Sequence, residues 1–408
     1  MIKQKTYLDK LNLWKEKDVI KVITGIRRCG KSTLLQQFRD ELLQSGIGNN
    51  QIIYLNFEDL ANEELLDYRK MYARVTSQLI PDQMNYVFLD EVQMIPDFQK
   101  AVDSLYIQNN VDLYITGSNA YLLSGELATL LSGRYVEINM LPLSFADYLE
   151  LHPGAKDEAF AEYMRLGGFP YILNDGNPER IAGDYLEGIY NTIIVKDVEQ
   201  RQIRQNKDPN KRKITDIALL KNIARFLANS VGNPISDKKI ADYLTSSGRK
   251  ISQNTVSDYV DALIESYIFY PVERYNVIGK ELLRQNRKLY ITDLGLRNHI
   301  LPRSGYDLGF TLENIVFLEL IRRGFQVNVG KVGELEIDFV AKKASMPNYF
   351  QVTASMLEKS TFEREMASLK AVKDNYPKTV LTLDRFTTGD YDGIQVMNVV
   401  DWLLSGRS

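Results

Sequence analysis

Residues 19–44 read VIKVIT-GIRRCGKS-TLLQQFRDELLQ, and this stretch decides the fold of the first part of the chain. An apolar run of strand length, 19–24, leads into the octapeptide 25–32, and a segment with helical apolar spacing leaves it. The octapeptide has the pattern G-x-x-x-x-G-K-[ST], in which glycines let backbone N–H groups wrap phosphates at a helix N-terminus. A chance match in a glycine-bearing turn is the alternative, and the flanking strand and helix argue against it. The stretch therefore predicts a phosphate-binding loop.

The loop chemistry predicts ATP and Mg²⁺ as ligands. Lys31 is expected to reach the β- and γ-phosphates, and the Ser32 hydroxyl is expected to ligate Mg²⁺. The residues expected to contact the nucleotide are Gly25, Ile26, Arg27, Arg28, Cys29, Gly30, Lys31, Ser32 and Thr33.

A second acidic motif follows the apolar run 85–89, which ends in Asp90 and Glu91. Ligands of parallel sheets collect at the carboxyl ends of the strands, so both acids are expected beside the loop. Asp90 is expected to hold Mg²⁺ through water, and Glu91 to polarise the attacking water, which indicates hydrolysis and not binding alone. The alternative is an exposed acidic turn after a core strand.

Two further positions are candidates for catalysis. The run 111–117 is followed by Ser118 and Asn119, either of which is expected to sense the γ-phosphate; the alternative is a helix N-cap. Arg134 precedes the next strand-like run and is expected to point at the γ-phosphate of a neighbouring subunit. The alternative for Arg134 is an ordinary surface arginine.

Short β-rich runs alternate with helical stretches up to about residue 145, at 19–24, 51–57, 85–91 and 111–117. This alternation predicts an α/β fold with a doubly wound parallel sheet. We expect an ATPase core at 1–142 and a mostly helical lid at 143–205.

The composition argues against several other classes of protein. Fifty basic and 53 acidic residues give a formal net charge of −3, and 25% charged with 44% apolar residues are ordinary for a folded protein. The chain has a single cysteine, Cys29, which excludes an internal disulfide and favours a cytoplasmic setting. Two histidines and one cysteine argue against structural zinc. No signal peptide and no apolar run of about 20 residues is visible, so no membrane partner is expected.

Several segments together resemble the bacterial and archaeal AAA+-type ATPase family: TGIRRCGKSTLL (24–35), VFLDEVQ (87–93), the run 114–149, RLGGFPYIL (165–173), YITDLGLRN (290–298) and EIDFV (336–340). The resemblance covers essentially the whole chain. It implies an ATPase core followed by a C-terminal region, and a homo-oligomer, such as a hexameric ring, whose sites are completed by the adjacent subunit. It also implies action on DNA.

Residues 206–275 resemble a winged helix-turn-helix. Helical segments at 215–230, 236–245 and 252–266 precede a strand-like run at 270–275, and the cationic stretch 201–213 comes just before them. Polar amides at an exposed helix start can read bases while neighbouring cations bind phosphates. The candidate DNA contacts are Arg249, Lys250, Gln253, Asn254 and Thr255. A protein-contact surface is the alternative.

After a turn-rich connector at 276–310, residues 311–408 resemble the restriction-endonuclease-like fold, with the order helix, three strands, helix, strand. The acids that this resemblance places at a metal are Glu313, Glu336 and Asp338, with Gln351 where the family has an acid. Thr353 stands where the family has a lysine, and it cannot supply the cation that stabilises the transition state. We expect a degenerate domain that does not cut.

We expect an enzyme that couples Mg·ATP hydrolysis to binding and remodelling of duplex or branched DNA, such as a recombination junction. One alternative is a nucleotide-dependent switch whose C-terminal region binds a protein partner. A second is an ATP-gated nuclease.

Overall fold

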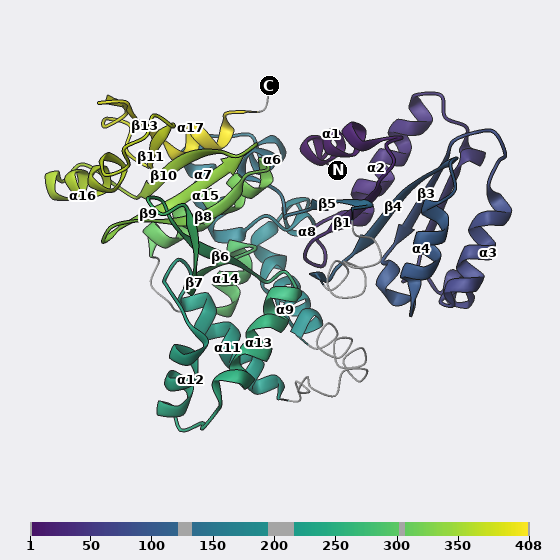
Figure 1. Cartoon of the computed structure of the whole chain (residues 1–408), viewed down its shortest axis with the longest axis horizontal. Helices are drawn as coiled ribbons and strands as arrows, with labels where there is room; N and C mark the ends of the chain where they lie inside the picture. The colour runs from purple at the N-terminus through teal and green to yellow at the C-terminus, as the bar shows by residue number, and fades with distance from the viewer. Residues whose placement is uncertain (1, 121–132, 195–215, 302–306, 407–408) are drawn as a thin grey trace. The chain divides into compact units, whose positions relative to one another are not determined.

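The computed structural model describes residues 2–120, 133–194, 216–301 and 307–406 (Figure 1). The chain divides into two compact units, Met1–Leu141 with Glu265–Tyr267, and Pro142–Ile264 with Ile268–Ser408. The cationic stretch 201–213 and the boundary expected at 205 lie outside the described residues.

The first unit is built on a five-stranded sheet, all of whose strand pairs are parallel. The strand order is β2-β3-β4-β1-β5, and Figure 1 labels β3, β4, β1 and β5 of this sheet. The strands are β1 (Ile20–Thr24), β2 (Ile52–Asn56), β3 (Asn85–Asp90), β4 (Val111–Gly117) and β5 (Tyr135–Asn139). The helices of this unit are α1 (Lys5–Trp14), α2 (Lys31–Gln44), α3 (Tyr68–Gln78) and α4 (Phe98–Tyr106), with short 3-10 turns η1 (Asn49–Gln51), η2 (Leu60–Leu65) and η3 (Val92–Met94). The predicted α/β fold with a parallel sheet is confirmed.

Helices cover both faces of this sheet, so its central strands are buried along their whole length. All five residues of β1 and all six of β3 are buried. On one face, α3 and α4 pack on Val22, Val87 and Leu89. On the other face, Phe38 of α2 contacts the rings of Phe88 and Tyr114. The sheet is thereby fixed between helices, and its carboxyl edge is free to carry loops.

The second unit combines helices with an eight-stranded mixed sheet of order β12-β13-β11-β10-β9-β8-β6-β7. Its strands are β6 (Phe269–Asn276), β7 (Glu281–Ile291), β8 (Gln326–Val332), β9 (Leu335–Lys343), β10 (Met346–Thr353), β11 (Lys378–Thr382), β12 (Gly389–Tyr391) and β13 (Ile394–Asn398). Its helices are α6 (Phe145–Leu151), α7 (Lys156–Leu166), α8 (Pro170–Leu173), α9 (Pro178–Thr192), α11 (Ile217–Asn229), α12 (Asp237–Ser246), α13 (Gln253–Glu265), α14 (Leu294–Ile300), α15 (Leu308–Arg322), α16 (Lys359–Lys370) and α17 (Val399–Leu404).

The segment 276–310 differs from the expected connector. It contains β7, which pairs antiparallel with β6, and β6 pairs in turn with β8, so this segment belongs to the large sheet. A register shift between Val272 and Arg274, and a positive φ of 61° at Asn286, interrupt the alternation of side chains along the hairpin. That irregularity hides the strand from a reading of the sequence pattern.

Two glycine-containing motifs, RLGGFP and TDLG, meet within the second unit. Asp293 caps α14 through the Leu296 N–H and also accepts the Gly168 N–H at 2.6 Å. A Cβ on Gly167 would lie 2.3 Å from an Asp293 oxygen, and one on Gly168 would lie 2.2 Å from the Leu143 carbonyl oxygen. Both positions therefore require glycine.

Candidate active site

At two positions, the loop between β1 and α2 has a backbone conformation that only glycine adopts easily. Gly25 has a φ of 140° and Gly30 a φ of 108°, and Gly30 is the N-cap of α2. A Cβ on Gly25 would lie 2.1 Å from the Met140 carbonyl oxygen. The two glycines thus allow the loop to turn tightly against Met140, the residue after β5, and to lead its N–H groups into the helix start.

Lys31 is buried, and its ammonium group binds back to the start of the loop. Its Nζ donates to the carbonyl oxygens of Gly25 and Ile26 at 3.0 and 3.2 Å, and it lies 3.9 Å from Glu91 Oε1. A buried ammonium needs such partners. Phosphate oxygens are stronger acceptors than carbonyls, so a bound triphosphate would draw Lys31 away from the loop.

The other loop residues have separate environments. Arg27 pairs with Glu58 at 2.9 Å, whereas Arg28 is exposed and has a φ of 66°. Cys29 is fully buried, and burial raises the pKa of its thiol. Ser32 and Thr33 lie in the first turn of α2, next to Lys31.

Asp90 is completely buried, and both of its oxygens accept hydrogen bonds from neighbouring strands. The Thr116 hydroxyl donates to Oδ1 at 2.5 Å, while the Tyr54 hydroxyl and Asn56 Nδ2 donate to Oδ2 at 2.8 and 3.1 Å. Because both carboxylate oxygens already accept hydrogen bonds, Asp90 fits a role in which it contacts a metal through a water molecule.

Tyr54, Asn56 and Thr116 are site residues that the sequence analysis missed. Asn56 stands directly across from Asp90 in the β2–β3 register. Tyr54 and Asn56 alternate on one face of β2, and this polar alternation at the carboxyl end of an apolar strand was the available signal. Burial, followed by the charge of Asp90, raises the pKa of Tyr54.

Glu91 is buried beside Lys31, in a left-handed backbone conformation with a φ of 56°. Its N–H donates to Thr116, and its carboxylate accepts from the Ser118 hydroxyl at 2.7 Å and from Gln93. Burial acts to raise the pKa of Glu91, but the Lys31 charge and these hydrogen bonds outweigh it, so the pKa lies below its ordinary value. Glu91 is therefore a carboxylate at neutral pH and can accept a proton.

Four predicted residues, Lys31, Asp90, Glu91 and Ser118, lie together at the carboxyl edge of the sheet. Ser118 contacts Glu91 directly, while Asn119 is buried at the next position. Arg134 is not part of this group. It precedes β5, and its backbone oxygen accepts from Ile20 N–H, at the amino end of β1.

The oxygen donors Ser32 and Asp90 fit Mg²⁺, which favours one or two protein oxygens together with phosphates and waters. Among the described residues, no group of three or more His, Cys, Asp or Glu side chains could hold a metal by itself. A magnesium site at this edge would therefore depend on the nucleotide.

The candidate DNA contacts lie at the start of α13, which Gln253 begins. Gln253 and Asn254 are exposed, and Thr255 is bonded to Ser252. Arg249 forms an ion pair with Asp216, so it has an intramolecular partner that a phosphate would have to replace. Lys250 is exposed.

The four predicted residues of the nuclease-like tail do converge. Lys288 of β7, which the sequence analysis missed, lies between Glu313 and Glu336, with its Nζ 2.9 Å from an oxygen of each. Tyr290 also donates to Glu313. Lys288 and Glu313 are buried, so Lys288 supplies the counter-charge that two close carboxylates need.

Asp338 and Gln351 complete this cluster across two paired strands. Asp338 Oδ2 accepts from Val352 N–H at 2.8 Å, and the Asp338 N–H donates to Gln351 Oε1 at 3.3 Å. Burial and the charge of Glu313 raise the pKa of Asp338 well above its usual range. The Thr353 hydroxyl donates to the Ser355 carbonyl oxygen.

Comparisons with known proteins give two family matches. A family described as an AAA domain matches residues 17–149, and a domain of unknown function, DUF8612, matches residues 157–307. The first match contains all six candidate catalytic residues. The second begins one residue into α7 and extends past α14, and it includes the β6–β7 hairpin.

Full-length relatives are also found. An uncharacterized protein of Haemophilus influenzae is 40% identical over 410 residues, covering 99% of both chains. An uncharacterized protein of Methanocaldococcus jannaschii is 31% identical, covering 87% of this chain and 79% of its own. A solved structure, a Walker-type ATPase of Pyrococcus abyssi, is similar with a TM-score of 0.51 and 16% identity, over 74% of this chain and 96% of its own. This structural likeness supports the fold.

Within the part of the chain that the structure describes, no helix has both the length and the apolar character needed to cross a bilayer.

Proposed function

This chain belongs to the AAA+-type family of P-loop ATPases, and we propose that it couples Mg·ATP hydrolysis to binding and remodelling of DNA. The observation that carries the hydrolytic part is the state of Glu91, a buried carboxylate between the Lys31 ammonium and the Ser118 hydroxyl. A nucleotide-binding site without hydrolysis would not need such a base.

The residues divide the chemistry as follows. Lys31 binds the β- and γ-phosphates and stabilises their charge. Ser32, and Asp90 through water, would hold Mg²⁺, which would neutralise charge on the phosphate oxygens. Glu91 orients the attacking water and accepts its proton. Because Ser118 bonds the carboxylate that activates the water, we assign to it, ahead of Asn119, the sensing of γ-phosphate loss.

Arg134 completes the site of an adjacent subunit. It lies at the amino end of the sheet, whereas the loop lies beyond the carboxyl end of β1. A guanidinium beside the transferring phosphoryl group stabilises the charge that builds up there. This role requires a head-to-tail homo-oligomer, for which a closed ring such as a hexamer is the simplest form.

The second unit is the proposed DNA-binding part. The order α11, a bridge between Ile235 and Arg287, α12, α13, β6 and β7 supports a winged helix. The exposed start of α13, with Gln253 and Asn254, would contact bases, and Lys250 with Arg249 would contact phosphates. A protein-contact role for this surface remains the alternative, and the Arg249–Asp216 ion pair favours it.

For the tail we propose a restriction-endonuclease-like domain that does not cut. Lys288 lies between Glu313 and Glu336, so a metal entering there would meet a buried positive charge. Gln351 contributes a neutral amide, and Thr353 contributes no cation. Branched DNA as a substrate rests on fold analogy alone. We also propose a cytoplasmic location for the protein. A chain with a single cysteine has no internal disulfide, which is typical of proteins in a reducing compartment.

The test is phosphate release by the full-length protein with and without DNA. We expect hydrolysis that duplex or junction DNA stimulates several-fold, with DNA affinity that falls as salt rises. Glu91→Gln should retain labelled ATP and not hydrolyse it, while Glu63→Gln, an exposed control, should behave as wild type. Rapid turnover by Glu91→Gln would contradict the assigned base.

Other outcomes separate the alternatives. Slow turnover that is the same with and without DNA would contradict DNA remodelling and support the switch. Cleavage of junction DNA with Mg²⁺ or Mn²⁺ would contradict the non-cutting tail.

A further inference from the structure

The turn between α13 and β6 has a bulky residue at a position where helices commonly end in glycine. Tyr267 has a left-handed φ of 59°, and the Ile268 N–H donates to the Leu263 carbonyl oxygen at 3.2 Å, the hydrogen bond that closes such a helix end. Glycine adopts this conformation without cost because it has no Cβ, whereas a tyrosine there is strained. A strained residue persists only where its surroundings hold it in place, and such residues gather at functional sites.

The Tyr267 side chain has its contacts in the first unit. Residues Glu265–Tyr267 belong to that unit, and Tyr267 is buried, with only 6% of the residue exposed. Its hydroxyl lies 3.5 Å from Oε1 of Glu137 on β5. Burial, followed by the charge of Glu137, raises the pKa of Tyr267, so the hydroxyl keeps its proton and can donate a hydrogen bond.

Glu137 joins Tyr267 to the residue that precedes the nucleotide loop. The hydroxyl of Thr24, which is fully buried, donates to the same Glu137 oxygen at 2.6 Å. The next residue is Gly25, whose carbonyl oxygen accepts from the Lys31 ammonium at 3.0 Å. A continuous series of contacts therefore leads from the end of α13 to the lysine that is expected to bind phosphate.

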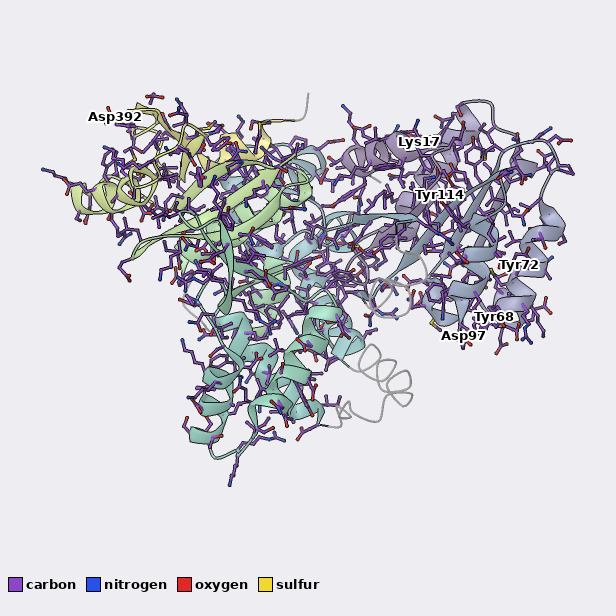
Figure 2. The ribbon with its side chains drawn as sticks, viewed as in Figure 1. Lys17, Tyr68, Tyr72, Asp97, Tyr114 and Asp392 are labelled. Carbon is purple, nitrogen blue, oxygen red and sulfur yellow. The ribbon has the colours of Figure 1, made fainter. Side chains whose placement is uncertain are left out.

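The strand β1 is firmly held before it reaches Thr24. Lys21 of β1 donates to Asp112 of β4, and the hydroxyl of Tyr114, which is labelled in Figure 2, donates to the same carboxylate at 2.7 Å. The strand is also paired with β4 on one side and with β5 on the other. We therefore expect a change at Gly25 to act on the side-chain contacts of Thr24 and not to be absorbed along β1.

We propose that Tyr267 is a positioning residue that couples the nucleotide loop to the end of α13. A bound triphosphate draws Lys31 away from the Gly25 carbonyl oxygen, and the loop then shifts Thr24 relative to Glu137. The contact of Tyr267 is released, and the strained turn opens. This inference rests on the proposed binding of ATP at the loop, and it gives α13, the helix proposed to contact DNA, a physical link to the nucleotide.

The test measures amide hydrogen exchange by mass spectrometry in full-length Glu91→Gln protein, with and without Mg·ATP. Binding of ATP is measured in parallel with a fluorescent analogue. We expect ATP to speed exchange in peptides covering 263–269 by about three- to tenfold, the factor that corresponds to the loss of one hydrogen bond. Peptides covering α12 serve as the reference.

Substitution of Tyr267 separates the coupling from the helix end itself. Tyr267→Phe keeps the buried ring and lacks the hydroxyl, so residues 263–269 should exchange at the faster rate both with and without ATP. Because ATP then no longer has to break the Tyr267 contact, its affinity should rise by the same factor. Tyr243→Phe, the same change at an exposed tyrosine of α12, should behave as the parent does.

The partner of the hydroxyl provides a second arm. Glu137→Ala, at an exposed residue, should give the same results as Tyr267→Phe. The double variant should show no further change, because both substitutions break one contact.

The outcomes distinguish the coupling from the ATPase assignment. Unchanged or slower exchange at 263–269 in a parent that binds ATP would overturn the coupling and leave the ATPase assignment intact. An ATP response that persists in Tyr267→Phe, or an ATP affinity that does not rise in it, would also overturn the coupling, since a residue that only ends a helix has no effect on ATP. A parent that binds no ATP would contradict the proposed function itself.

Discussion

Asp293 is a buried carboxyl group whose ionisation the fold opposes. It accepts the N–H groups of Gly168 and Leu296, yet burial outweighs these bonds and raises its pKa from 3.8 to about 6. The folded state therefore holds the proton more tightly than the unfolded state does. Above pH 6 the ionised group lowers stability, and this loss disappears as the pH falls from 6 towards 3.8.

The shift sets the size of the effect. At a pH well above 6, the rise in the pKa of Asp293 from 3.8 to about 6 lowers the free energy of unfolding by about 3 kcal/mol. Between pH 7.5 and pH 5.0, the linkage relation gives about 1.4 kcal/mol of added stability from this one group. Asp293→Asn keeps the shape and an oxygen for the Leu296 N–H but cannot titrate, so it lacks this pH-dependent part and has a constant cost at Gly168.

The measurement is urea unfolding of the second unit. The chain has two tryptophans, Trp14 and Trp402, and Trp402 is buried in α17, so a Trp14→Phe background makes its fluorescence a reporter of that unit. The wild-type free energy of unfolding minus that of Asp293→Asn should be about 1.4 kcal/mol larger at pH 5.0 than at pH 7.5. Other titrating groups cancel in this difference. Equal differences at the two pH values would refute the reasoning.

Four further outcomes are expected. Lys31→Ala should abolish binding of labelled ATP, and near-normal hydrolysis would contradict the site. Lys288→Met should lower the free energy of unfolding by about 3–5 kcal/mol, read from Trp402, because it leaves Glu313 buried without its counter-charge; no loss would show that this ion pair is not structural. Gly168→Ala should destabilise the second unit by about 1–3 kcal/mol, since its Cβ would lie 2.2 Å from a backbone oxygen, and a neutral result would contradict the close approach. Arg249→Ala with Lys250→Ala should weaken DNA binding in gel shift and reduce its salt dependence; unchanged affinity would move the DNA surface elsewhere.

The sequence was enough to predict what depends on local spacing. The loop 25–32 and the acids at 90–91 each lie on a short stretch whose strand and helix can be recognised, and the parallel sheet follows from their alternation. Partners that come from other strands could not be predicted in the same way. Tyr54 and Asn56 reach Asp90 only because β2 lies beside β3, and this order is set by packing of the whole sheet.

The second unit shows the same limit more strongly. Lys288 meets Glu313 from a strand whose alternation is broken by a register shift, and Gly168 meets Asp293 across 125 residues of sequence. Neither contact has a local signature. The domain boundaries and the roles of α13 and the tail stay predictions.

The hairpin β6–β7 has a practical consequence for dissecting the chain. β6 bonds to β7 on one side and to β8 on the other, so it joins the β6–β7 hairpin to the rest of the large sheet. A fragment ending near residue 307 would expose the unpaired edge of β6 and lose the partners of Lys288, and such a fragment would aggregate. An activity lost in such a fragment could then be assigned wrongly to the deleted tail, although the residues that carry it are still present in the fragment. Point substitutions in the full-length chain are the sound way to separate the role of the helices from the role of the tail.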